Sequence, residues 1–383
     1  MGLLESLAGG LAAPLGVIVP FLFVLTVVVF VHELGHFLVA RWCSVKVDTF
    51  SIGFGKEIWG FTDSHGTRWR FAWIPLGGYV KFMDDDNAAS APSRDALSRM
   101  TEEQRAGSFH AKPVWQRAAV VAAGPFANFL FAIAIFAVIF MVYGVTRMEP
   151  RVAEVLPGTP AAVAGFQVDD LVVRIDGQAI DDFTDLQRIV STSPGRSLVF
   201  EVERGGKVVA LNVEPELREQ EDRIAGKITR PLIGIRGPSS AAKITHERVG
   251  PLDAVAMGTQ RTWDIITSTL GYIRDVFGGR QPADQLGGPV RIADVAGKVA
   301  QQGIVELVFL TAFLSVSIGL LNLLPVPVLD GGHLVFYAIE ALRGRPLSEG
   351  VQDVSFRIGL ALILMLMVFS FRNDLGIIAR WLS

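Results

Sequence analysis

The chain has 383 residues and a net charge of −3, half of its residues are hydrophobic, and its mean hydropathy is +0.41. A mean hydropathy this high is unusual for a soluble globular protein and is typical of a chain partly embedded in a membrane. The small net charge gives no reason to propose nucleic acid as a partner. Because the sequence has a single cysteine, Cys43, it can form neither an intrachain disulfide nor a cysteine-rich zinc site.

Four stretches are long and apolar enough to cross a bilayer, which takes about 20 helical residues. They run from Leu15 to Ala40, from Ala118 to Tyr143, from Val305 to Leu324, and from Ile358 to Phe371 with flanking residues. The first stretch is too long for the apolar segment of a signal peptide and has no basic segment before it. We therefore expect it to be retained as a membrane span.

Basic residues indicate how these spans are oriented, because cytoplasmic loops are enriched in Lys and Arg. The first twelve residues contain neither, whereas the loop after the first span contains many, from Arg41 to Arg117. The short connection between the last two spans contains Arg343 and Arg345. We expect both loops in the cytoplasm and the segment from about 144 to 302 on the opposite side of the membrane.

The first span carries the motif HELGH at His32 to His36. Two histidines four residues apart project from one face of a helix, so their ring nitrogens can bind a single Zn²⁺ ion. Glu33 between them is placed to act on the attacking water, as in zinc peptidases. Ionisable residues inside a span are costly and usually functional, which favours a catalytic site over an incidental polar helix end.

A catalytic zinc ion usually has three protein ligands, and the end of the third span offers the missing one. The sequence NLLPVPVLDGGH runs from Asn322 to His333. Asp330 is the predicted third ligand, because the first and third spans run in the same direction and end in the same leaflet. The glycines after it are expected to let the backbone turn sharply. His333 is a rival ligand that the spacing alone does not exclude.

Together, the HELGH motif and the NxxPxPxLDG segment resemble the site-2 protease family of intramembrane metalloproteases, especially the bacterial regulators of sigma-E protease. The resemblance covers nearly the whole chain. It implies that His32, His36 and Asp330 bind zinc. It also implies that Glu33 is the catalytic base, and it favours Asp330 over His333 as a ligand.

Two asparagines are weaker candidates for substrate binding. The resemblance implies that Asn322 holds the substrate backbone near the scissile bond. Asn128 follows Gly124-Pro125 in the second span, and an asparagine in a span needs a polar partner. The resemblance places this motif beside the active site. Direct participation in catalysis and a hydrogen bond between packed helices are equally compatible with the sequence.

Between the first two spans, Phe50 to Phe61 and Thr67 to Phe82 are predicted to be β-strands joined by a turn at Asp63 to Gly66. Their aromatic residues suit the membrane interface, and family members have a membrane-associated β-hairpin here. An edge strand in this hairpin is a candidate to hold an unwound substrate by strand addition. The alternative is a hairpin that only covers the cytoplasmic face.

From Arg151 to about Gly237, short strands and turns resemble a bacterial PDZ domain. Such domains can bind extended peptides, so a peptide ligand and a role as a spacer or size filter are both open. The best-known members of the family have two tandem PDZ domains. Pro238 to Gly303 is too short and too helical for a second one, and Val255 to Val276 is predicted to be amphipathic.

The predicted fold is a polytopic α-helical membrane protein with four transmembrane helices, a membrane-associated β-hairpin and one inserted α+β PDZ domain. The predicted parts are a membrane domain over residues 1–150 and 304–383, a PDZ domain over 151–237 and a helical linker over 238–303. The predicted location is the bacterial inner membrane, in contact with lipid. The active site is expected near the cytoplasmic side and the PDZ domain in the periplasm.

The predicted activity is that of an intramembrane zinc endopeptidase. The resemblance implies a substrate already shortened by another protease, such as an anti-sigma factor, and remnant signal peptides are a further candidate. The alternative function is a membrane-tethered PDZ adaptor with a non-catalytic metal site. Retention of Glu33 speaks against the adaptor, because a structural zinc site has no use for an unliganded base between its ligands.

Overall fold

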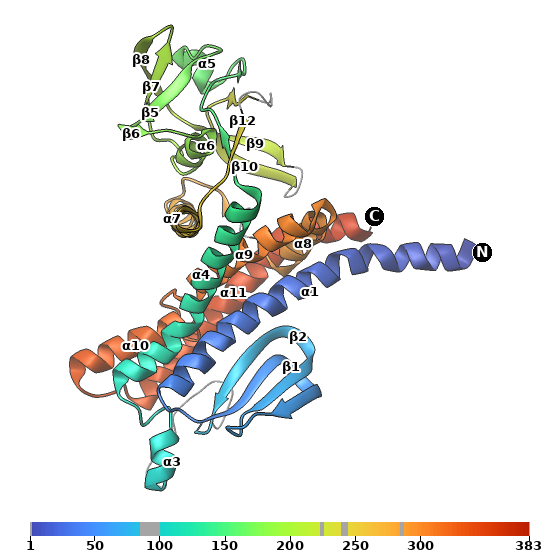
Figure 1. Ribbon diagram of the computed structural model, residues 1–383, viewed down its shortest axis with the longest axis vertical. Helices are drawn as coiled ribbons and strands as arrows, with labels where there is room; N and C mark the ends of the chain where they lie inside the picture. Colours follow the sequence, from blue (N-terminus) through green and yellow to red (C-terminus); the bar gives the residue numbers. More distant parts are fainter. Residues whose placement is uncertain (1, 85–99, 223–225, 239–243, 284–286, 383) are drawn as a thin grey trace. The chain divides into compact units, whose positions relative to one another are not determined.

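The computed structural model describes residues 2–84, 100–222, 226–238, 244–283 and 287–382 (Figure 1). The chain forms two compact units. The first, called here the membrane unit, comprises residues 1–135 and 288–383. The second unit comprises residues 136–287. Each unit is described by itself.

Four helices in the described part of the chain are long and apolar enough to cross a membrane. They are α1 (Gly2–Trp42), α4 (Val114–Tyr143), α9 (Ile304–Asn322) and α11 (Glu349–Leu382). Their candidate spans are Leu15–Trp42, Val114–Tyr143, Ile304–Asn322 and Glu349–Ile377. The last is longer than the apolar stretch predicted from Ile358 to Phe371, because the helix continues through flanking polar residues that end the apolar stretch.

The predicted β-hairpin is present as β1 (Val47–Thr62) and β2 (Arg68–Phe82), and both strands fold back on themselves. Residues 47–52 pair with 68–71 on one side and with 78–82 on the other, while 57–62 pair with 68–72. Gly53 and Gly77 have positive φ angles of 88° and 146°, which allow the strands to bend. Two strands thus make a curved sheet whose outer segments are 57–62 and 78–82.

This sheet is attached to α1 by an aromatic cluster and a charged pair. Phe50 stacks on Trp69 and meets Phe37 of α1 edge to face, with ring centroids 4.3 and 5.5 Å apart respectively. Arg41 at the end of α1 forms a 2.9 Å ion pair with Asp63 in the turn of the hairpin. The hairpin is therefore fixed to the helix that carries the HELGH motif.

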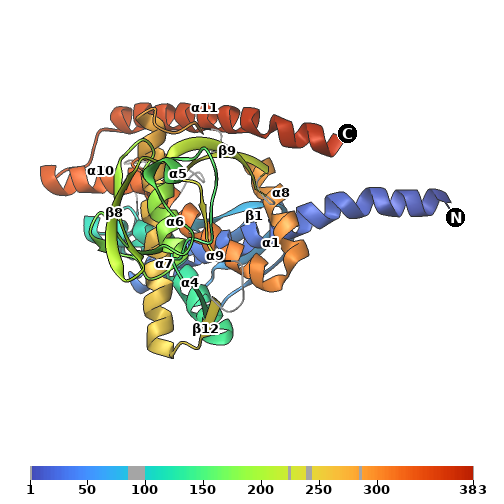
Figure 2. The ribbon, with the colours of Figure 1, turned by 90° about the horizontal axis from the view of Figure 1, so that it is seen from above.

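Three shorter helices complete the described part of the membrane unit: α3 (Glu102–Gly107), α8 (Pro289–Gln302) and α10 (Asp330–Arg343). Helix α8 lies against α1, α9 and α11 (Figure 2). The buried carboxylate of Asp374 in α11 accepts hydrogen bonds from the amides of Gly288, Val290 and Arg291 at 3.1–3.2 Å. A side chain of α11 thus caps the start of α8.

The second unit is built from short strands and three helices. A four-stranded antiparallel sheet has the order β6-β5-β7-β8, made of β6 (Gln178–Ala179), β5 (Leu171–Ile175), β7 (Leu198–Arg204) and β8 (Lys207–Val213). Its inner face packs into a core that includes Phe200, Ile175 and Leu186, the last from α6 (Phe183–Ser191).

Three two-stranded ribbons flank this sheet: β9 (Glu216–Asp222) with β10 (Gly226–Leu232), β4 (Glu154–Val155) with β11 (Ile235–Arg236), and β3 (Val145–Met148) with β12 (Ile244–Glu247). The remaining helices are α5 (Pro160–Ala164) and α7 (Pro251–Phe277). The α+β character matches the expectation for this region.

The structure divides the chain differently from the predicted linker over 238–303. Helix α7 belongs to the second unit and α8 to the membrane unit. The pairing of β12 with β3 brings the chain before α7 back to the residues that follow α4. Gly297 of α8 is in close contact with Val17 of α1, since a Cβ added to Gly297 would be 2.9 Å from the Cα of Val17. Helix α8 therefore packs on α1.

Candidate active site

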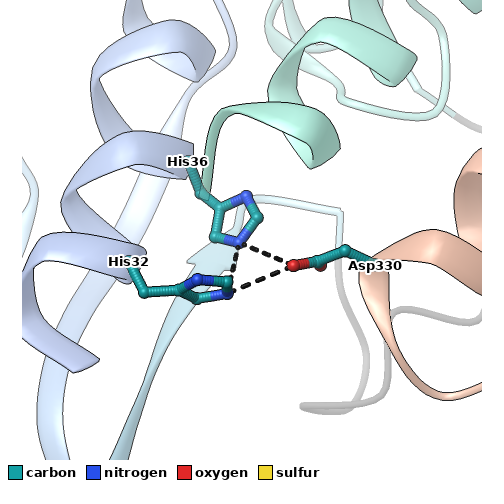
Figure 3. A group of neighbouring side chains, drawn as sticks. All are labelled: His32, His36 and Asp330. Carbon is teal, nitrogen blue, oxygen red and sulfur yellow. Dashed lines mark hydrogen bonds and ion pairs between the residues drawn. The ribbon is translucent and has the colours of Figure 1, made fainter. Parts of the chain in front are cut away.

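The two histidines of the HELGH motif and Asp330 converge in the membrane unit (Figure 3). The Nε2 atoms of His32 and His36 are 3.2 Å apart. They lie 3.1 and 3.5 Å, respectively, from Oδ2 of Asp330. All three donor atoms are within 4.8 Å of one another, although Asp330 is almost 300 residues away along the chain. The group is therefore compact enough to surround one metal ion.

Asp330 is positioned by an unusually tight junction between α9 and α10. Helix α9 ends at Asn322, and Asp330 is the first residue of α10. A Cβ at Gly331 would lie 2.3 Å from the carbonyl oxygen of Leu323, and one at Gly332 2.4 Å from that of Val326. The sequence suggested that these glycines would make a sharp turn, and this prediction was wrong. They lie in the first helical turn and let α10 pack directly on the backbone of the preceding loop.

Helix α4 holds both histidine rings. The Nδ1 atom of His36 is 2.9 Å from the carbonyl oxygen of Val120, and Nδ1 of His32 is 3.3 Å from the side-chain amide of Asn128. Between these contacts lies Gly124, where a Cβ would be 2.2 Å from Nε2 of His36. The Gly124-Pro125 motif marked this region in the sequence. The contact of Val120 has no sequence signal, because any residue has a carbonyl group.

A cavity of about 270 Å³ opens at the three ligand atoms. Glu33 lines it, and the backbone amide of Val80 in β2 donates a hydrogen bond to the Glu33 carboxyl group. Asn322 also lines the cavity. The hairpin was predicted from the sequence, but the sequence did not indicate that Tyr79 and its neighbours in β2 would line this cavity.

His333, the rival ligand, also lines this cavity but is not part of the converging group. Its ring packs against Phe336 and Phe356, with centroids 6.3 and 5.5 Å away. The contact with Phe356 places the His333 ring against α11, and the three converging donor atoms do not include a nitrogen of His333. The geometry therefore favours Asp330 as the third donor.

The chemistry of this donor set fits zinc. Because His36 donates its Nδ1 proton to Val120, its Nε2 presents a lone pair toward Asp330. Oδ2 of Asp330 faces both histidines, and a carboxyl group that binds a metal does so in its deprotonated form. A lone pair and a carboxylate facing each other at 3.5 Å are stabilised by a cation between them.

Comparison with known proteins agrees with this chemistry. The model of peptidase family M50 matches residues 20–366. A protein of Agrobacterium fabrum named "Putative zinc metalloprotease Atu1380" is 51% identical, over 94% of this chain and 96% of its own length. "Metalloprotease MmpA" of Caulobacter vibrioides is 44% identical, over 94% of this chain and 95% of its own length.

Among solved structures, PDZ domains of SdrC-like proteins match part of the chain. The domain from Listeria monocytogenes is 22% identical and covers 23% of this chain and 84% of its own, with a TM-score of 0.19. The domain from Listeria innocua is 21% identical and covers 26% of this chain and 99% of its own, with a TM-score of 0.20. The family assignment rests on the sequence relatives. The chain belongs to peptidase family M50, the site-2 protease family, and is a zinc metalloprotease of the membrane.

Proposed function

We propose that the protein is an intramembrane endopeptidase that cuts within or next to the transmembrane segment of its substrate. The observation that carries this proposal is the convergence of His32, His36 and Asp330 beside Glu33, on helices that are long enough to span a membrane or that follow such a helix directly. A protease site in this place meets its peptide bond at membrane depth.

In this proposal His32, His36 and Asp330 hold the zinc ion. When bound, zinc supplies Lewis acidity for the scissile carbonyl and lowers the pKa of an attacking water. Glu33 takes a proton from that water and passes it to the leaving amine. The backbone amide of Val80 donates a hydrogen bond that helps to hold the carboxyl group of Glu33 in the cavity.

Substrate binding is proposed for the outer segment of the hairpin sheet, residues 78–82. Within the described residues, this segment pairs with another strand on one side only. Its residues Gly78, Tyr79 and Val80 line the cavity next to Glu33. An unwound substrate added as a further strand would lie along the catalytic residues. Asn322, which also lines the cavity, is proposed to hold the substrate backbone.

The substrate proposed is a single-pass membrane protein already shortened by another protease, such as an anti-sigma factor or a remnant signal peptide. The protein is proposed to lie in the bacterial inner membrane, with the active site toward the cytoplasm and the second unit in the periplasm. The distribution of Lys and Arg supports this orientation. The second unit contains a groove of about 550 Å³ between α6 and β10, which is proposed for an extended peptide ligand.

The test is cleavage of a purified single-pass substrate by reconstituted protein. We expect wild type to cut it, and chelator-treated protein and Glu33→Gln to lose at least about 100-fold in rate. The matched control is Glu306→Gln, which changes a carboxylate at the start of α9 that does not line the cavity. Equal cleavage by wild type and Glu33→Gln would overturn the mechanism. Zinc-loaded wild type without cleavage would favour the adaptor function.

A further inference from the structure

Asn128 lies directly behind His32, on the side away from the other ligand atoms. It is fully buried, and its side-chain nitrogen Nδ2 is 3.3 Å from Nδ1 of His32. Its Oδ1 atom is buried and has no hydrogen-bond partner within the described residues. A buried amide with only one contact, and that contact a proposed zinc ligand, calls for an explanation beyond packing.

The surroundings of Asn128 hold it firmly in this place. Its backbone carbonyl accepts a 2.9 Å hydrogen bond from the buried hydroxyl of Ser315 in α9. A Cβ at Gly319, one turn further along α9, would lie 3.2 Å from the Cβ of Asn128. Helix α9 is therefore in close contact with α4 at Asn128. The amide can rotate about its last bond, but it cannot move away from the ring.

The two orientations of the amide have opposite consequences for His32. If the NH₂ group faces the ring, as in the structure, it donates to Nδ1, and the neutral ring then carries its proton on Nε2, where the metal would bind. A half-turn about the last bond of the side chain exchanges the nitrogen and the oxygen. If the oxygen faces the ring, it accepts a proton from Nδ1, and Nε2 offers its lone pair. Either orientation leaves one end of the amide without a partner within the described residues, so hydrogen bonding elsewhere does not choose between them.

The partner of His36 shows which orientation suits a metal. Nδ1 of His36 faces the carbonyl oxygen of Val120, which can only accept. That contact fixes the tautomer whose Nε2 lone pair faces Asp330. Val120 and Asn128 lie on the same helix, eight residues apart, so α4 places one partner behind each histidine. An acceptor behind both rings would prepare both Nε2 atoms for the same ion.

We propose that Asn128 is a positioning residue that accepts a hydrogen bond from Nδ1–H of His32 through its side-chain oxygen, and so presents Nε2 of His32 to zinc. This inference rests on the proposed role of His32 as a zinc ligand. It assigns Asn128 to the metal centre and not to the substrate. The effect of Asn128 on catalysis is then exerted through zinc affinity.

Zinc affinity of the full-length protein, measured by competition with a chromophoric chelator, tests this role. Asn128→Leu keeps the shape of the side chain but cannot form a hydrogen bond, and we expect it to bind zinc about 10- to 100-fold more weakly. Asn128→Asp can only accept when ionised, and we expect it to bind zinc within about threefold of wild type or more tightly. Thr311→Val, which removes a buried hydroxyl of α9 away from the site, is the control.

The outcomes separate this inference from the proposed function. Wild-type protein that holds no zinc, or a His32→Ala variant that holds zinc as well as wild type does, would contradict the metal site itself. Loss of zinc in His32→Ala but not in Asn128→Leu would overturn only the role of Asn128. Equal weakening by Asn128→Leu and Asn128→Asp would show that the amide donates, which also overturns it.

A second readout does not depend on affinity. In zinc-loaded protein labelled with ¹⁵N-histidine, we expect the Nδ1 of His32 to carry a proton and its Nε2 to carry the metal. Thermal unfolding of each variant shows whether it is folded, so that loss of zinc is not confused with loss of structure. An unprotonated Nδ1 of His32 in the loaded wild type would contradict the proposal.

Discussion

The membrane unit and the second unit differ in how their interiors are packed. Large apolar side chains, such as Phe200 and Leu198, which are 0% exposed, form the core of the second unit. The membrane unit also buries apolar side chains, such as Val28, but two of its helices cross at a glycine, Gly35 of α1, where a Cβ would lie 2.3 Å from the carbonyl oxygen of Ala123 in α4. Water drives apolar side chains together, whereas lipid does not, so helices in a membrane gain stability from close backbone contact.

The comparison predicts that sensitivity to mutation is reversed between the units. Adding one carbon should be most damaging in the membrane unit, where space at helix crossings is absent. Removing carbons should be most damaging in the second unit, where burial of apolar area stabilises the fold. The variants below test this reversal, beginning with the one for which we expect the largest effect.

Gly124→Ala is expected to abolish zinc binding and proteolysis. The new methyl group would lie 2.2 Å from Nε2 of His36 and 2.9 Å from Cε1 of His32, so both rings must move from the metal position. Zinc content and cleavage rate measure the effect, and we expect at least about a 100-fold loss in rate. Gly16→Ala in α1 is the matched control, since a Cβ there has nothing within 4 Å. Normal activity of Gly124→Ala would refute the close contact of α4 with the histidines.

Phe200→Ala is the corresponding change in the second unit. It removes a fully buried ring from the core and is expected to lower the free energy of unfolding by about 3–5 kcal/mol. Limited proteolysis during heating can follow the second unit, while zinc content follows the membrane unit, which should keep its metal. Val163→Ala, at a side chain that is 87% exposed, is the control. Zinc loss in Phe200→Ala equal to that in Gly124→Ala would break the comparison.

Asp374→Ala tests whether polar contacts also join helices in the membrane unit. The change leaves three amides at the start of α8 without their acceptor and is expected to cost about 2 kcal/mol. Asp374→Asn retains an acceptor oxygen and should lose less. The thermal midpoint in detergent measures both variants. If Ala and Asn were equally stable, the hydrogen bonds of the cap would contribute little.

Much of this arrangement could be predicted from the sequence, for definite physical reasons. The spans follow from the length of apolar stretches, and the HELGH motif follows from helical spacing, which is local. The convergence of Asp330 with the histidines is a long-range contact. It could be anticipated because the charged loops give the first and third spans the same direction and because the NxxPxPxLDG segment resembles that of the site-2 proteases.

Other features could not be predicted, because they depend on backbone atoms or on distant packing. The carbonyl oxygen of Val120 and the folding of β2 onto Glu33 have no side-chain signal. The role of Gly331 was misjudged, since a glycine after a helix suggests a turn as readily as a close contact. Helix α8 was assigned to a linker because its amphipathic pattern does not show which partner it packs against.

The hairpin sheet was predicted in part, since its strands follow from the sequence but its packing does not. The smallest effect that we expect concerns the charged turn of this hairpin. Burial alone would raise the pKa of Asp63, but hydrogen bonds from the amides of His65 and Thr67, the Trp69 indole and the Arg41 guanidinium lower it to about 2, from an ordinary value of 3.8. A depressed folded-state pKa contributes stability above the unfolded pKa and loses it as the pH falls through the folded one. At pH 6, Asp63→Asn should therefore have a free energy of unfolding lower than that of wild type by about 1 kcal/mol, given the partial exposure of the side chain, and should unfold at a lower temperature. The difference should shrink between about pH 4 and pH 2, and a difference independent of pH would show that Asp63 acts through its shape and not through its charge.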